Sequence, residues 1–122
     1  MLSGERLLII EEEFLIALDI QRALEEANAL QTVFARNFAE AASMQERFGE
    51  FDLAIVNAPL PGTPDIDIAN RLASAGPAIV ICTAAPVDLT DTQLSTAELV
   101  HKPFSDEALV SACRRALQRR AS

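Results

Sequence analysis

The chain has 122 residues with a formal net charge of −8, and 50% of the residues are hydrophobic. This length supports one domain with a buried core but not two. The acidic balance argues against a non-specific nucleic-acid binder, because neutralising phosphates requires clustered Lys and Arg. No apolar run is long enough to span a bilayer, and the first residues lack the apolar stretch of a signal peptide.

The two cysteines lie far apart in the sequence, Cys82 in an apolar run and Cys113 in a late helical pattern. We interpret them as buried thiols in a reducing cytoplasm and not as a disulfide. With a single histidine in addition, the sequence gives no support to a zinc site.

The first part of the chain alternates short apolar runs with helical patterns. A strand is predicted at 6–10, where the continuous apolar run indicates burial on both faces of a parallel sheet. A helix with its apolar residues on one face is predicted at 14–27. A second strand follows at 30–35, and Asn37 can cap the next helix, predicted at 38–48.

The middle of the chain repeats this alternation. The third strand is predicted at 52–56 and is followed directly by Asn57, two prolines and a glycine. A short helix at 66–73 leads to the fourth strand at 78–82. A helix at 88–94 is only weakly indicated by the pattern.

The last unit consists of a strand at 98–101 and a helix that begins after Ser105, its predicted cap, and runs to about Gln118. The basic residues of 114–120 complement the negative end of this helix. Strict alternation of strands and helices predicts an α/β fold with a parallel sheet, helices on both faces and right-handed crossovers. The whole chain, 1–122, is predicted to be a single domain.

Polar side chains follow four of the predicted strands: the acids 11–13, Asn57, Thr83 and Lys102. Functional sites of such sheets form at the carboxyl ends of the strands. Two carboxylates with backbone oxygens suit Mg²⁺, and a lysine with a hydroxyl suits a phosphoryl group. Each residue alone also has a structural explanation, such as an acidic helix start or a Lys-Pro turn. Their joint placement favours a phosphoryl-transfer site that lacks a carboxylate at position 57.

The sequence resembles the receiver domains of two-component response regulators, the CheY-like proteins, over nearly its whole length. The matching stretches are LLIIEEEFLIALDIQRAL, FDLAIVNAPLPG, AIVICTA and HKPFSDEAL. The resemblance implies a bacterial signalling protein. It also implies a three-layer, doubly wound, flavodoxin-like fold whose five parallel strands have the order 2-1-3-4-5.

The resemblance assigns roles to the residues at the strand ends. Glu11 and Glu12 match the acid pair that helps to hold Mg²⁺, and the backbone carbonyl of Pro59 matches a further metal contact. Asn57 stands where the family has the aspartate that accepts phosphate from a histidine kinase.

The remaining family positions are partly kept. Thr83 and Lys102 match the hydroxyl and the lysine that contact the phosphoryl group, and Pro103 matches a proline of the cis type. The family usually has an aromatic residue three positions before the lysine, which swings inward on phosphorylation, but this chain has Leu99. The glycine that is usual shortly after LPG is also missing.

These departures predict an atypical receiver that works by phosphorylation-independent protein–protein interaction. The expected partners are signalling proteins, a histidine kinase or a downstream effector, which would dock on the face made by the helix at 88–94, the strand at 98–101 and the last helix; a homodimer is left open. No cofactor is expected, and any Mg²⁺ binding should be weak. Lys102 is then expected to contact an acid or the Asn57 oxygen.

Two other functions remain open. The chain is a conventional phosphorelay receiver if Asn57 is an engineered replacement of aspartate. An enzyme, for example a phosphatase that uses Glu12 and Lys102, ranks last because neither a nucleophile nor a poised histidine faces the site. His101 precedes Lys102 on a strand, so its side chain is expected on the opposite face.

Overall fold

The computed structural model describes residues 4–60, 62–85 and 94–121. Five parallel strands form one sheet in the order β2-β1-β3-β4-β5, which confirms the predicted fold class and strand order. The strand boundaries differ from the predicted ones by at most one residue. The strands are β1 (Arg6–Ile10), β2 (Gln31–Ala35), β3 (Leu53–Asn57), β4 (Ala78–Thr83) and β5 (Glu98–His101).

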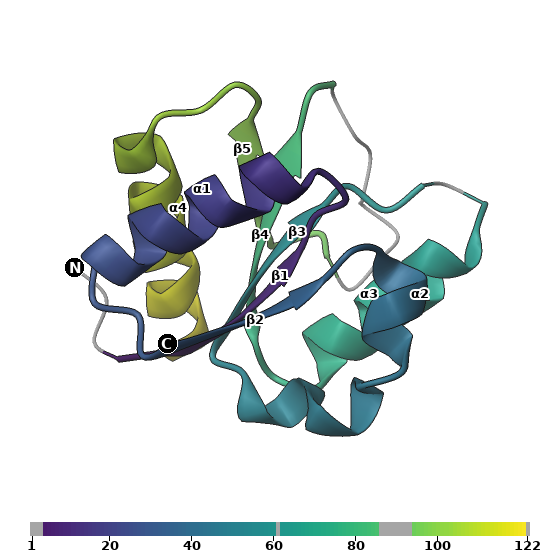
Figure 1. Ribbon diagram of the computed structural model, residues 1–122. Coiled ribbons are helices and arrows are strands. Elements are labelled where there is room, and N and C mark those ends of the chain that lie inside the picture. Colours follow the sequence, from purple (N-terminus) through teal and green to yellow (C-terminus); the bar gives the residue numbers. More distant parts are fainter. Residues whose placement is uncertain (1–3, 61, 86–93, 122) are drawn as a thin grey trace.

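Helices cover both faces of this sheet, with α1 and α4 on one face and α2 and α3 on the other (Figure 1). Each face has its own apolar cluster, because alternate residues of a strand point to opposite sides. No helix in the described ranges has the length and hydropathy that crossing a bilayer requires. The described helices are α1 (Phe14–Glu26), α2 (Phe38–Ala42), the 3-10 helix η1 (Gln45–Glu50), α3 (Pro64–Ser74) and α4 (Asp106–Ala121).

The predicted caps are present. The Asn37 side chain accepts a hydrogen bond from the Glu40 N–H at 2.8 Å, and the Ser105 hydroxyl accepts one from the Ala108 N–H at 3.1 Å. At the start of α3, the Thr63 hydroxyl accepts from the Asp65 N–H at 3.3 Å. Each cap satisfies one of the N–H groups that the first turn of a helix leaves without a partner.

The prediction of a single helix at 38–48 is wrong, because the chain forms α2 and then the separate helix η1. The Ser43 hydroxyl donates to the Glu40 carbonyl at 2.7 Å, and the Ser43 N–H bonds the same carbonyl at 3.2 Å. This local bonding competes with α-helical hydrogen bonds and tightens the chain after Ala42. The helix predicted at 88–94 lies outside the described residues, except for the buried Leu94.

Ion pairs fasten α4 to the sheet. Glu98 is buried and pairs with Arg115 at 2.8 Å and with Arg119 at 2.7 Å, while Arg120 pairs with Asp52 at 3.1 Å. The basic residues of 114–120 were predicted to complement the helix dipole, and the ion pairs show that this is only part of their role. Three of its cations neutralise carboxylates at the base of the sheet.

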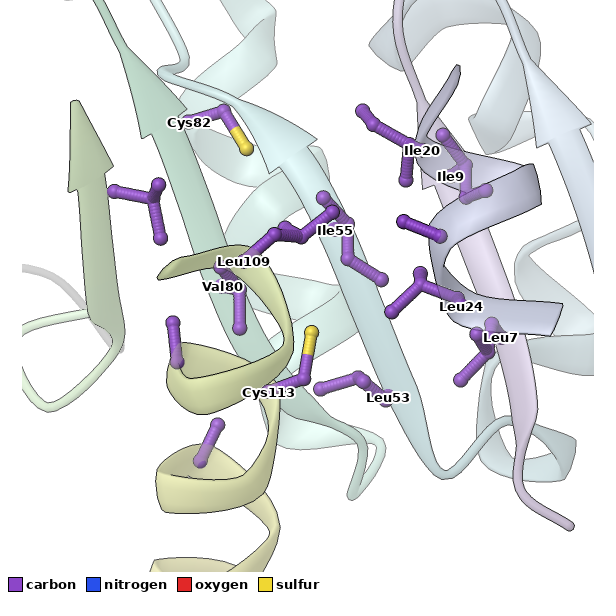
Figure 2. Packing of buried hydrophobic residues seen from close by; sticks show 14 of the residues in the cluster. Leu7, Ile9, Ile20, Leu24, Leu53, Ile55, Val80, Cys82, Leu109 and Cys113 are labelled. Carbon is purple, nitrogen blue, oxygen red and sulfur yellow. The ribbon is translucent and has the colours of Figure 1, made fainter. Parts of the chain in front are cut away.

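Both cysteines are free and lie in the apolar cluster between α4 and the sheet, as Figure 2 shows. Burial raises the pKa of the Cys82 thiol to about 12, although the nearby Lys102 ammonium lowers it. Burial also raises the pKa of the Cys113 thiol to about 12. Since the thiolate is the reactive form, neither group is activated near neutral pH.

We therefore expect both thiols to resist alkylation in the folded protein from pH 7 to about pH 9, and to react fully after unfolding. Intact mass after a short iodoacetamide pulse, with and without guanidinium chloride, measures this difference. The denatured sample is the control that counts both cysteines. Rapid labelling of either thiol without denaturant would contradict the packing of this cluster.

Candidate functional site

The register of the parallel strands brings four polar residues to the same edge of the sheet. Glu11 follows β1, Asn57 ends β3, Thr83 ends β4 and Lys102 follows β5. The pairing of β3 with β4 and of β4 with β5 sets the ends of these strands side by side. The structure thus gathers the predicted site residues by topology, as expected for sheets of this type.

Lys102 connects two of the other strand ends. Its Nζ donates to the Asn57 Oδ1 at 2.9 Å and to the Glu11 Oε2 at 3.2 Å. The predicted contact of Lys102 with an acid or with the Asn57 oxygen is confirmed, and both partners are used at once. The second carboxylate oxygen of Glu11 accepts the Glu13 N–H at 3.1 Å.

The charges in this network balance. The Glu11 side chain is only 3% exposed and the Lys102 side chain 23%, so their ion pair lies largely away from water. A buried carboxylate without a cation is strongly unfavourable, and an ammonium within hydrogen-bond distance removes most of that penalty. Asn57 accepts a hydrogen bond and adds no charge. The cluster therefore carries one negative and one positive group.

The Thr83 hydroxyl is engaged in its own loop. It donates to the Ala85 carbonyl at 2.6 Å and accepts from the Ala85 N–H at 3.2 Å. The side chain is buried, and its bonds to Ala85 turn the chain as it leaves β4. Thr83 thus lies at the predicted edge with its hydroxyl already used for structure.

A cavity of about 190 Å³ adjoins Asn57. Glu12, Arg36 and Asp65 contribute charged groups to its wall, and Glu12 is exposed, unlike its neighbour Glu11. Arg36 and Asp65 were not among the predicted site residues. Both could have been found from their positions, because Arg36 directly follows β2 and Asp65 lies in the first turn of α3, next to the carboxyl ends of the strands.

The oxygen atoms at the strand ends, as they are hydrogen-bonded in this arrangement, do not form a site that fits a divalent cation. The Glu11 and Asn57 oxygens that would coordinate it already accept hydrogen bonds from Lys102. Within the described ranges, no three Asp, Glu, His or Cys side chains come together as a metal site. Pro59 is buried beside the site and offers only its backbone carbonyl.

The predicted switch position lies on the surface. Leu99 is 42% exposed on β5, whose burial alternates so that Leu99 and His101 face outward while Val100 faces the core. Lys102 instead reaches the site, which agrees with the predicted opposite placement of His101. The Lys102–Pro103 peptide bond is cis.

A scan against protein-family models and a search of curated protein sequences found no match. Solved structures do match over nearly the whole chain. A response regulator receiver protein from Sinorhizobium medicae has a TM-score of 0.80 and 18% identity, covering 98% of this chain and 99% of that chain.

Two further receiver structures agree. A receiver domain protein from Clostridium thermocellum has a TM-score of 0.75 at 23% identity, covering 96% of this chain and 97% of its own. A CheY-like one from Methanospirillum hungatei has a TM-score of 0.76 at 17% identity, with 98% of both chains covered. At these identities the likeness establishes the fold. The chain has the fold of response regulator receiver domains.

Removing the site cation should destabilise the protein. We expect Lys102→Met to lower the free energy of unfolding by about 3 kcal/mol at neutral pH, because Glu11 is left as a buried charge without a partner. Urea unfolding followed by circular dichroism measures the change.

The control is Arg36→Met, which breaks the ion pair with Glu40 at 79% and 41% side-chain exposure. We expect that change to cost less than about 0.5 kcal/mol, since exposed pairs contribute little. Equal losses in the two variants would mean that Lys102 does not neutralise a buried charge.

Proposed function

We propose that this chain is an atypical receiver domain of a response regulator, which acts in the cytoplasm by phosphorylation-independent protein–protein interaction. The observation that carries the proposal is the hydrogen bond of Lys102 Nζ to the Asn57 amide oxygen at 2.9 Å. The position from which a receiver would accept phosphate holds a neutral group, and the lysine that would contact the phosphoryl group is bonded to it.

The chemistry of the amide supports this reading. Forming an acyl phosphate requires a carboxylate oxygen that attacks phosphorus and supplies the electron pair of the new bond. The Asn57 nitrogen lone pair is delocalised, and its oxygen carries no full charge. The oxygen is also hydrogen-bonded to Lys102. A phosphoryl donor therefore meets no competent nucleophile at this strand end.

Weak Mg²⁺ binding is part of the same proposal. Carboxylate charge is a main determinant of affinity for hard cations, and Asn57 contributes none. Glu11 is already neutralised by Lys102 at 3.2 Å. A divalent ion would have to displace that ammonium, and Glu12 alone is a poor substitute because it is exposed.

The output would then be a docking surface around β5 and α4. Leu99 and His101 are exposed there, and a cavity of about 530 Å³ lies between the edge of β5 and α4, lined in part by Phe104, Ser111 and Arg115. The Arg115 guanidinium is already paired with Glu98, so the apolar side chains of this surface are what suit it to an apolar partner segment. We propose a histidine kinase or a downstream effector as this partner, and we propose no catalytic activity.

Phosphoryl donors should leave the protein unmodified. After incubation with acetyl phosphate and Mg²⁺, we expect an unchanged intact mass, because Asn57 cannot form the acyl phosphate. The matched comparison is Asn57→Asp, which restores the nucleophile and one anionic metal ligand and should label slowly.

The conformational response of Asn57→Asp is the sharper measurement. We expect amide chemical-shift changes on phosphorylation to stay near the strand ends, because Leu99 has no ring or hydroxyl to exchange an outward for an inward rotamer. Large shifts across β5 and α4 would show that the switch survives. The chain would then be a conventional receiver with one changed residue.

A further inference from the structure

β2 forms one edge of the sheet, and within the described strands no neighbour pairs with its outer side. In a parallel pair, alternate residues direct both backbone groups to the neighbouring strand. The Ala35 carbonyl accepts the Glu11 N–H at 3.0 Å, so Ala35 and, two residues earlier, Val33 face β1. Thr32 and Phe34 therefore direct their N–H and C=O groups to the open edge.

An exposed apolar patch adjoins this edge on the α1 face of the sheet. Gln21 Nε2 donates to Thr32 Oγ1 at 2.9 Å, which places this side of α1 against β2. Phe14 and Leu18 lie on the same side by helical spacing. Phe14 is 72% exposed, Leu18 39% and Phe34 37%. These three residues are the edge patch.

The edge lacks the features that usually keep strands apart. Segment 29–35 contains no charged residue and no proline, the residues with which proteins commonly protect an edge strand. The net charge of −8 repels a second copy of the chain over most of the surface. An uncharged edge with free backbone groups is where two copies can approach without that repulsion.

We propose that two copies of this chain associate through antiparallel pairing of their β2 strands about a two-fold axis at Val33. In this register Thr32 of each copy lies opposite Phe34 of the other, and these are the residues whose backbone groups point outward. Each of the two symmetric pairs can exchange both N–H···O=C bonds. Val33 then forms the non-hydrogen-bonded pair on the axis.

The side chains suit the same register. Directly opposite residues share one face of a sheet, so Phe34 lies over Thr32 of the second copy, with Leu30 of that copy diagonally beside it. Leu30 is 67% exposed in the single chain. Arg36 lies opposite Leu30 of the other copy, so no like charges lie directly opposite each other within the paired strands. The pairing covers apolar side chains that one copy leaves in water.

This dimer does not involve the strand-end site. A result against the dimer therefore leaves the proposed function untouched, and a result against the proposed function leaves the dimer untouched. Sedimentation velocity from about 5 to 500 μM should show a reversible monomer–dimer equilibrium. Phe34→Lys should raise the dissociation constant at least about tenfold, by placing a charge in the edge patch. Phe34→Pro should do the same, because it removes an outward N–H that the monomer does not use.

The control is Leu99→Lys, which adds the same charge at a residue of similar exposure on β5, the opposite edge strand. It should leave the dissociation constant unchanged. Circular dichroism checks that each variant is folded. A monomer at every concentration overturns the proposal. A dimer that survives both Phe34 variants, or that Leu99→Lys dissolves, overturns it as well.

A cross-link tests the register itself. Val33→Cys places two thiols on the axis, where paired Cα atoms are about 4.5 Å apart, within the range that a disulfide bridges. Oxidation with copper phenanthroline should give a covalent dimer from Val33→Cys and none from the control Leu99→Cys. The native cysteines are buried and do not compete. Absence of the Val33→Cys dimer overturns the proposed axis.

Discussion

The interaction on which the strand-end site depends is the contact of one ammonium with a buried carboxylate and an amide. A carboxylate at 3% side-chain exposure is strongly unfavourable without a cation, and Lys102 supplies one to Glu11 at 3.2 Å. The same ammonium donates to Asn57 at 2.9 Å. With a neutral residue at position 57, the Glu11 carboxylate and the Lys102 ammonium are one negative and one positive charge at the centre of the site.

The rest of the fold keeps these groups in place. Parallel registers align the strand ends, and two apolar clusters hold the sheet between its helices. At the other end of the sheet, Glu98 and Asp52 pair with arginines of α4. Charge pairs thus lie at both ends of an apolar core that contains both cysteines. The position of α4 and the position of Lys102 therefore both depend on the apolar cluster between α4 and the sheet.

The meeting of Glu11, Asn57 and Lys102 could be predicted, because buried apolar runs and strand-end residues are local signals that a parallel sheet brings together. The strand order was predicted from the resemblance to receiver domains. The break in the helix after Ala42 could not be predicted, because it depends on which carbonyl accepts the hydrogen bond of the Ser43 hydroxyl. The loop bonding of Thr83, likewise, depends on backbone geometry after β4. The pairing of Glu98 with Arg115 and Arg119 depends on how α4 packs.

Because the Lys102 ammonium neutralises the buried Glu11, we expect this site to bind a divalent cation only weakly. A calorimetric titration with Mg²⁺ tests it most directly, with Asn57→Asp as the comparison. We expect no saturable heat for the unmodified chain at Mg²⁺ concentrations up to several millimolar, and tighter binding by Asn57→Asp, which adds an anionic ligand beside Glu11. Sub-millimolar Mg²⁺ binding by the unmodified chain would mean that the Lys102 ammonium does not keep the metal from this site.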